Sequence, residues 1–135
     1  MSVLHMLDTD IASYLIKGRA PQIEAKLSQL APSMVCISVV TQAELMYDLK
    51  RLPDNHPLHH AVRQLLSIIR VLPWDSEAAN YYAGIRHQLV SSGQTIGDMD
   101  MMIAAHSLSA NAVLVTNNTR HYDRIEAPLT LVNWV

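Results

Sequence analysis

The chain has 135 residues, of which 50% are hydrophobic and 16% are charged, and its net charge is -2. That length suits one domain with a well-filled core, so we expect residues 1–135 to form a single domain. Without a block of basic residues, the chain does not have the composition of a non-specific duplex-binding protein. The charged fraction is below the ~25% usual for soluble domains. This low charged fraction has two explanations. Another chain covers part of the surface, or a compact α/β domain buries both faces of its sheet.

A single cysteine, Cys36, lies in an apolar stretch. One thiol cannot form an internal disulfide, and a buried free thiol fits a reducing compartment. The amino terminus lacks the pattern of an export signal, and no apolar run is long enough to span a membrane. We therefore expect a cytoplasmic protein without a membrane segment.

The chain begins with a short apolar run, Val3–Asp8, that ends in a carboxylate and is followed by helical sequence at 11–16. Apolar residues on both alternations predict a strand buried on both faces, as in a parallel sheet under helices. Further strands are predicted at 34–40, 70–73, 112–116 and 129–134, and further helices at 21–30, 41–50, 58–69, 75–91 and 98–108. Strands separated by helices predict βαβ crossovers and a mainly parallel sheet of about five strands.

Polar residues collect where these strands end. Ligands of parallel sheets gather beyond the carboxyl ends of the strands, which is where Asp8 stands. Three further polar clusters follow strands or begin helices, at 38–44, 96–105 and 116–118. In the first of them, Thr41 and Glu44 have the spacing of a helix capping box, so a capping role competes with a role in a site.

The second cluster contains two acids, Asp98 and Asp100. Residues two apart are about 200° apart around a helix, so both cannot face one site. We interpret Asp98 as the N-cap and Asp100 as the acid that points into the site. In the third cluster, Asn118 follows Thr116 directly after a strand, where an ordinary polar turn is the alternative.

Together these segments supply a set of oxygen ligands from Asp8, Glu44, Asp100 or Asp98, and Asn118. Carboxylates packed together raise one another's pKa and cost stability unless a cation joins them. An all-oxygen set suits Mg²⁺ or Mn²⁺, and Mg²⁺ activates water for phosphodiester cleavage. None of the four clusters contains a histidine to act as a base, so we expect attack by metal-activated water. That route leaves a 3′-OH and a 5′-phosphate.

The motifs that carry this set also resemble those of a known family. They are Leu7-Asp8-Thr9-Asp10, Ser38-x-x-Thr41-x-x-Glu44-Leu45, Gly97-x-x-Asp100-x-x-Ile103-Ala104-Ala105, and Val115-Thr116-Asn117-Asn118 with Arg120-His121-Tyr122. Their order and spacing resemble a PIN domain over nearly the whole chain, and within that family the VapC toxins of bacterial toxin–antitoxin pairs. The resemblance implies a three-layer α/β/α sandwich, a homodimer, and a cognate antitoxin as partner. It also implies a Mg²⁺-dependent ribonuclease, with Mn²⁺ as a substitute, that cuts structured RNA such as the anticodon loop of tRNA.

The resemblance also implies a role for each residue of the site. The metal ligands are Asp8 and Asp100, the third acid is Glu44, the fourth acidic position is Asn118, the supporting residues are Thr9, Ser38 and Thr116, and the candidate RNA contact is Arg120. Because Asn118 is neutral where the family has an acid, a second tightly held metal is less favoured.

Two other functions remain open at this point. In a haloacid dehalogenase-like phosphatase, Asp8 and Asp10 would be the nucleophile and the acid. That family needs a lysine before its second acidic motif, whereas no lysine follows Lys50. The second alternative is a non-catalytic binding module of the PIN fold. Activity on a small aryl phosphate, as opposed to a folded RNA, separates the phosphatase from the nuclease.

Overall fold

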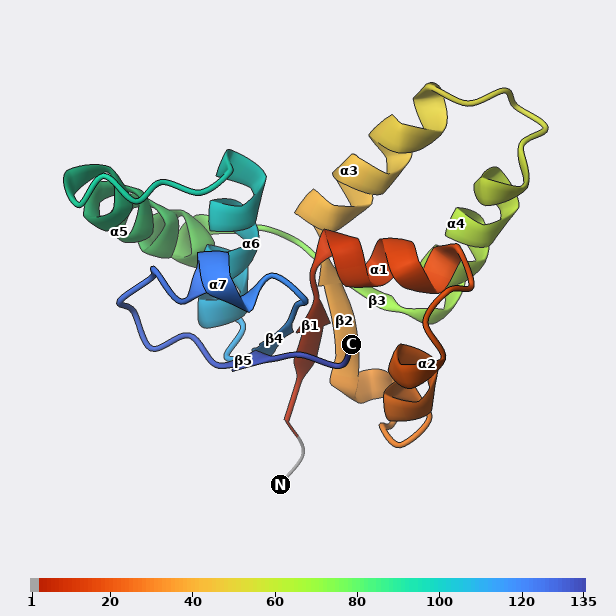
Figure 1. Ribbon diagram of the computed structural model, residues 1–135, viewed down its shortest axis with the longest axis horizontal. Coiled ribbons are helices and arrows are strands. Elements are labelled where there is room, and N and C mark those ends of the chain that lie inside the picture. Colours follow the sequence, from red (N-terminus) through yellow and green to blue (C-terminus); the bar gives the residue numbers. More distant parts are fainter. Residues whose placement is uncertain (1–2) are drawn as a thin grey trace.

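A five-stranded sheet lies at the centre of the computed structural model, which describes residues 3–135. Its strands are β1 (His5–Leu7), β2 (Val35–Ser38), β3 (Arg70–Leu72), β4 (Val113–Val115) and β5 (Leu131–Val132). They are ordered β3-β2-β1-β4-β5, and every neighbouring pair is parallel. This confirms the predicted α/β class and parallel sheet, and it places β1 in the middle (Figure 1).

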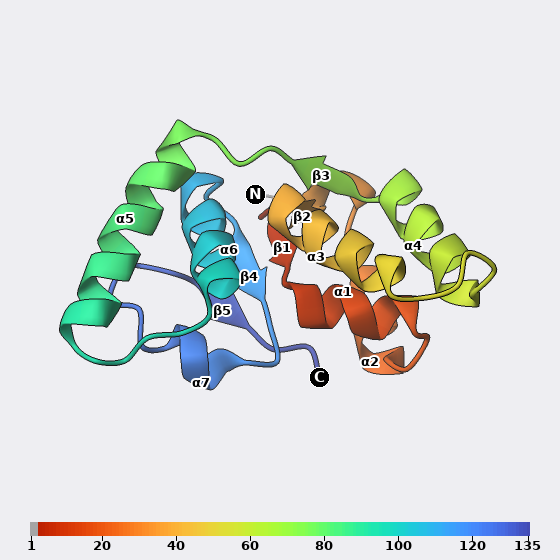
Figure 2. The same ribbon diagram turned by 90° about the horizontal axis from the view of Figure 1, so that it is seen from above.

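Helices cover both faces of this sheet. They are α1 (Thr9–Ile16), α2 (Pro21–Leu27), α3 (Val39–Lys50), α4 (Pro57–Ile68), α5 (Ser76–Ser91), α6 (Asp98–Ser109) and α7 (Thr119–Tyr122). Figure 2 shows α5 and α6 on one side of the strands and α1, α2 and α4 on the other. This is the expected three-layer α/β/α sandwich.

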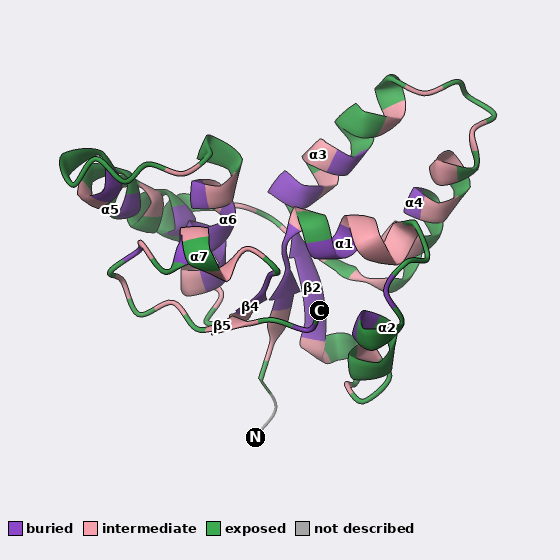
Figure 3. Cartoon of the chain, viewed as in Figure 1, coloured by how far each residue is buried: buried purple, intermediate pink, exposed green. Residues whose placement is uncertain are grey.

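The strand side chains explain this layering. Successive residues of a strand point to opposite faces, and in β1 Met6 packs into the core under α5 and α6 while Leu7 packs into the core under α1 and α2. Both are fully buried, as are Cys36 and Ile37 at the matching positions of β2 (Figure 3). The two-sided burial accounts for much of the low charged fraction, since buried strands leave little room for charge.

The structure corrects the predicted boundary between the second strand and the third helix. The strand ends at Ser38 rather than at residue 40, and α3 begins at Val39 rather than at Thr41. The Ser38 hydroxyl accepts the backbone N–H of Val40 at 3.0 Å and so acts as the N-cap. The capping-box interpretation of Thr41 and Glu44 is therefore wrong: Glu44 is left available for a site, and the buried Thr41 contacts Thr9.

The start of α6 also differs from the prediction. Gly97, not Asp98, is the N-cap, and Asp98 is the first helical residue with its side chain exposed. Its charge lies in the first turn, where it complements the positive end of the helix without bonding a backbone N–H. The predicted cap of α5 is confirmed, because Asp75 accepts the N–H of Ala78 at 3.1 Å.

The outer strands are shorter than expected. β5 contains only Leu131 and Val132 of the predicted 129–134, and β3 ends at Leu72 before Pro73, which cannot donate to a strand ladder. Among residues 3–135, none of the helices is both long and apolar enough to cross a lipid bilayer.

Candidate active site

Asp8 leaves the carboxyl end of the central strand and begins the first helix. Its Oδ1 accepts the backbone N–H of Ile11 at 2.9 Å, so it is the N-cap of α1, and it also accepts a hydrogen bond from the Thr116 side chain. Only 4% of Asp8 is exposed. Its pKa is raised from 3.8 to about 6, chiefly by burial and to a lesser extent by the charges of Asp10 and Asp100, while the two hydrogen bonds oppose the rise.

Glu44 arrives from the second turn of α3. Its Oε1 accepts the hydroxyl of Thr9 at 2.6 Å, and Thr9 lies 3.1 Å from the hydroxyl of the buried Thr41. These contacts connect α3 to α1 and fix one carboxylate oxygen, while the described residues offer no partner to Oε2. The pKa of Glu44 is raised, first by desolvation and then by Asp100 and Asp10.

Asp100 lies in the first turn of α6, on the other side of the sheet from α1. Its Oδ1 accepts the hydroxyl of the buried Tyr122 at 3.3 Å, which ties α6 to α7. Desolvation is the main reason that its pKa is raised, and Asp10 raises it as well, whereas the nearby His121 lowers it. The structure therefore joins Asp8, Glu44 and Asp100 into one electrostatic cluster.

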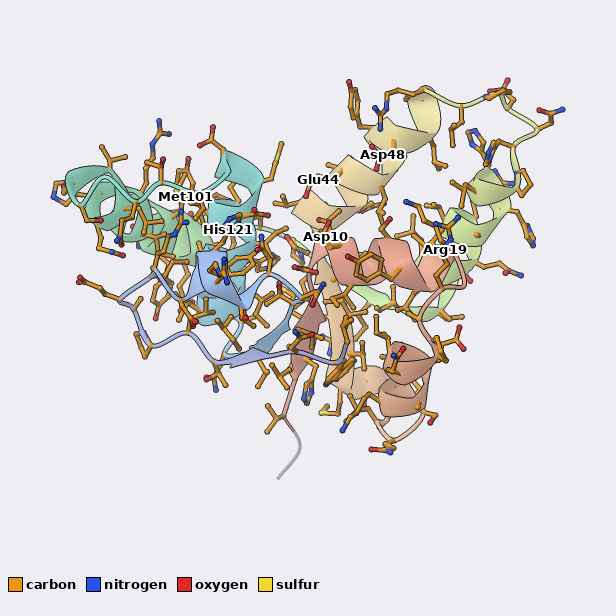
Figure 4. All side chains as sticks on the ribbon, in the orientation of Figure 1. Asp10, Arg19, Glu44, Asp48, Met101 and His121 are labelled. Carbon is orange, nitrogen blue, oxygen red and sulfur yellow. The ribbon has the colours of Figure 1, made fainter. Side chains whose placement is uncertain are left out.

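Asp10 belongs to the same cluster, although the sequence did not single it out as a site residue. Its charge raises the pKa of Asp8, Glu44 and Asp100 alike. Figure 4 shows it at the start of α1, next to Glu44 of α3. Its position two residues after Asp8 could have identified it, because both residues lie in the turn that follows the central strand.

Asn118 stands at the end of β4, as predicted, but its side chain has a specific partner. Its Nδ2 lies 2.7 Å from Nδ1 of His121, and its backbone N–H donates to Oγ1 of Thr116 at 2.8 Å. Thr116 therefore supports both Asp8 and the loop that carries Asn118. Arg120 is exposed on α7, and no hydrogen bond to it is formed within residues 3–135.

Ser38 is buried near the acids, but its hydrogen-bond partners within residues 3–135 are Val40 and His106 rather than an acid. Its hydroxyl caps α3 and lies 2.7 Å from Nδ1 of the buried His106, whose pKa is lowered chiefly by desolvation. The support that Ser38 gives to Glu44 thus passes through the start of α3.

Histidines are nearer to the acids than the motif clusters indicated. His106 directly follows the second cluster and contacts Ser38, and His121 follows the third and contacts Asn118. Residues 38–44, 96–105 and 116–118 contain no histidine, but the inference that no histidine lies near the acids is wrong. His106 is buried with Nδ1 occupied, whereas His121 is half-buried and lies close enough to influence Asp100.

The acids fit a hard divalent cation. Among residues 3–135 the only ion pair joins Arg51 and Asp48, so no lysine or arginine neutralises Asp8, Glu44 or Asp100. No three acidic, cysteine or histidine side chains in that range converge into a ready-made metal cage. Mg²⁺ is usually held by one or two carboxylates and several waters rather than by a protein cage. The donor set therefore fits Mg²⁺ or Mn²⁺ better than Zn²⁺.

Known proteins resemble this chain in sequence and in fold. Residues 5–127 match the model of the PIN domain family. Over 97% of the chain and 98% of the relative, the sequence is 35% identical to ribonuclease VapC2 of Haemophilus influenzae. It is 34% identical to the tRNA(fMet)-specific endonuclease VapC of Shigella flexneri, over 89% of this chain and 90% of that protein. The solved structure of DNA-bound VapBC from Salmonella typhimurium superposes with a TM-score of 0.91 at 32% identity, covering 98% and 99% of the two chains.

Proposed function

This chain belongs to the PIN-domain family, among the VapC ribonucleases, and on that premise we propose that it is a magnesium-dependent endoribonuclease and the toxin of a toxin–antitoxin pair. The observation that carries this proposal is the cluster of Asp8, Glu44 and Asp100. Three chain segments bring these acids together, desolvation raises the pKa of each, and within residues 3–135 no lysine or arginine forms an ion pair with them. Because the chain belongs to the PIN-domain family, the haloacid dehalogenase-like phosphatase is no longer an alternative.

Each acid has a role that its hydrogen bonds indicate. Asp8 and Asp100 would hold Mg²⁺, since each is fixed by a neighbouring hydroxyl or backbone donor and keeps oxygen lone pairs free. When bound, Mg²⁺ lowers the pKa of coordinated water and offsets negative charge on the phosphate. Glu44 has one oxygen held by Thr9, so its Oε2 is free to orient a water and accept its proton. Its raised pKa brings it closer to the working range of a general base.

We infer that water attacks from outside, leaving a 3′-OH and a 5′-phosphate. The competing route uses the ribose 2′-OH as nucleophile and needs a base. His121 is the histidine placed to serve in that way, because it neighbours Asn118 and Asp100. A substrate with one 2′-deoxy sugar at the cut separates the two routes, since internal attack requires that hydroxyl.

The test of the proposed function is cleavage of structured RNA, with total tRNA as the substrate, in the presence of Mg²⁺ or of excess chelator. Asp100→Asn should reduce the rate at least ~100-fold, because even indirect supports of metal ligands cost 10- to 100-fold. Asp98→Asn is the matched control and should keep most of the activity, since Asp98 is exposed and caps nothing. If the wild-type protein cuts no RNA in Mg²⁺, the non-catalytic module of the PIN fold is the better description.

The substrate and the assembly are proposed from the relatives. The Shigella flexneri protein is named for tRNA(fMet), and we propose tRNA, cut in its anticodon loop, as the target here. Unpaired loop bases can be splayed out and read, which suits an open site. We also propose a homodimer, which light scattering of the purified protein would test.

We propose a cognate antitoxin as the protein partner, because solved relatives are VapBC complexes. The surface offers an apolar groove between α1, α2 and α4. Two adjoining cavities of about 190 and 270 Å³ form it and share Leu15, Leu27, Leu65 and Ile68. Ile68 is 76% exposed, so Ile68→Asp should weaken antitoxin binding without unfolding the protein. Val90→Asp on the far helix α5 is the control, since Val90 is 57% exposed and lines neither cavity.

A further inference from the structure

A depression lies at the end of α1 that is farther from the acidic cluster, and it differs from that cluster in chemistry. Its volume is about 250 Å³, and it is formed by the end of α1, the start of α2, the loop after β4 and the chain end. The polar side chains that line it are those of Tyr14, Lys17, Arg19, Gln22 and Asn117. Its polar side chains supply an aromatic ring, two cations and two amides, and none of its side chains is acidic.

The two cations of this depression have no acidic partner. The only ion pair within residues 3–135 is that between Arg51 and Asp48, so Lys17 and Arg19 are free to meet an anion from solution. Both are exposed. In a chain of net charge -2, these two cations make a local positive region at the end of a helix whose first turn carries Asp10.

The backbone holds this group together. Gly18 has a φ of 66°, in the left-handed region that favours glycine. The chain therefore turns back after α1, and the N–H of Arg19 donates to the Tyr14 carbonyl at 3.2 Å. That turn sets Arg19 and Tyr14 on the same depression.

The opposite wall is fixed by the last residues of the chain. Oδ1 of Asn117 accepts Nδ2 of Asn133 at 3.1 Å, and Asn133 in turn accepts the N–H of Val135 at 2.9 Å. These bonds hold the Asn117 amide and leave its Nδ2 without a partner in residues 3–135. It is therefore a donor available to a ligand.

Helix α1 connects the acidic cluster to this depression. Asp10, Tyr14 and Lys17 are spaced i, i+4, i+7, which places them on one helix face. The axial rise from Asp10 to Tyr14 is about 6 Å, a distance that one extended nucleotide covers. Figure 4 shows Asp10 and Arg19 toward opposite ends of α1. Asn117 directly follows Thr116, which bonds Asp8.

We propose that this depression, formed by Tyr14, Lys17, Arg19 and Asn117, binds the nucleotide next to the phosphate that is cut. The inference rests on the proposed ribonuclease function. The Tyr14 ring stacks on an unpaired base, as aromatic side chains do in single-strand sites. Lys17 and Arg19 each contact one of the two phosphates that flank this nucleotide, and the Asn117 amide donates to the base or sugar. The site thus selects single-stranded RNA that extends along α1.

The test measures binding apart from cleavage. A fluorescein-labelled single-stranded RNA of about ten nucleotides is titrated with protein in excess chelator, and its anisotropy is followed at several salt concentrations. The variant Lys17→Gln/Arg19→Gln should bind about tenfold more weakly. Its plot of log affinity against log salt should be shallower by about 1.4, because each lost single-strand phosphate contact removes about 0.7.

The control variant, Arg63→Gln/Arg86→Gln, removes the same charge from exposed sites on α4 and α5 that do not line the depression. It should keep the wild-type slope. Tyr14→Leu should weaken binding at least about fivefold, the lower end for loss of base stacking, whereas Tyr14→Phe should stay within about twofold. Thermal melting of each variant separates these effects from loss of fold.

The outcomes distinguish this proposal from the proposed function. Equal affinities and slopes for Lys17→Gln/Arg19→Gln and its control would overturn the nucleotide site, even if the wild-type protein cuts RNA in Mg²⁺. The expected binding losses in a protein that never cuts RNA would support the nucleotide site and overturn the nuclease. A wild-type protein that does not bind the RNA at all would overturn the nucleotide site too.

Discussion

Replacing Asp8 by Asn should change how stability depends on pH. The folded protein holds the Asp8 proton more tightly than the unfolded chain does, since its pKa is about 6 when folded and 3.8 ordinarily. Below pH 3.8, Asp8 is protonated in both the folded and the unfolded state and does not oppose folding. As the pH rises from 3.8 past about 6, the free energy of unfolding falls, because the unfolded chain gives up this proton more readily. The shift corresponds to about 3 kcal/mol of destabilisation above pH 6 in the metal-free protein.

Asp8→Asn keeps the shape and the cap but not the charge. An Asn oxygen can accept the N–H of Ile11, as Asn is as good an N-cap as Asp, and the Thr116 hydroxyl can accept from the new amide. Between about pH 4 and pH 7.5, the free energy of unfolding of the variant should therefore rise by about 2 kcal/mol relative to that of the wild type. This is the part of the ~3 kcal/mol that falls within that pH range.

Urea unfolding in excess chelator at several pH values measures this difference. Asp98→Asn serves as the control and should show a flat difference, because Asp98 is exposed and bonds no backbone group. If the difference for Asp8→Asn is equally flat, desolvation does not strain the carboxylate cluster, and the argument that the cluster needs a cation fails with it.

Three further outcomes are expected. Saturating Mg²⁺ at ~100 Kd should stabilise the wild-type protein by about 2.7 kcal/mol in urea unfolding, and this gain should vanish in Asp8→Ala; an unchanged gain would remove Asp8 from the metal site. A substrate with a single 2′-deoxy sugar at the cut should still be cleaved in Mg²⁺ to a 3′-OH and a 5′-phosphate, and products with cyclic phosphate ends would instead implicate a base such as His121. Ser38→Ala should lower the free energy of unfolding by ~2–4 kcal/mol, since it removes the cap of α3 and leaves buried His106 without its partner; a loss under ~0.5 kcal/mol would show that neither bond matters.

The sequence predicted the parts of the fold that depend on local pattern. Runs buried on both faces, such as the one that ends at Asp8, identified the strands, and their alternation with helices implied a parallel sheet. The strand-to-helix boundary at Ser38 was missed because Val39 and Val40 are β-branched and resemble a continuing strand. Only the hydrogen bond of the Ser38 hydroxyl to the next turn decides where the helix starts.

The acids of the candidate site follow from the sequence pattern, but their hydrogen-bond partners do not. Asp8, Glu44 and Asp100 occupy strand or helix ends, where pattern and topology are informative. The contact of Tyr122 with Asp100 and that of His106 with Ser38 join residues far apart in the chain. No local spacing encodes such pairs, so they follow only from the packed arrangement of α3, α6 and α7.

Because β1 lies at the centre of the sheet, its position affects the order in which the site is completed during synthesis and folding. Asp8 is made first, yet its neighbours in the sheet are β2 and β4, and β4 ends at Val115. Thr116 donates a hydrogen bond to Asp8 and Tyr122 donates one to Asp100, and both are synthesised later still. Contacts of such long sequence separation close late in folding, and a domain generally folds as a unit during synthesis. A nascent chain therefore lacks its assembled carboxylate cluster until the segments through Tyr122 have left the ribosome.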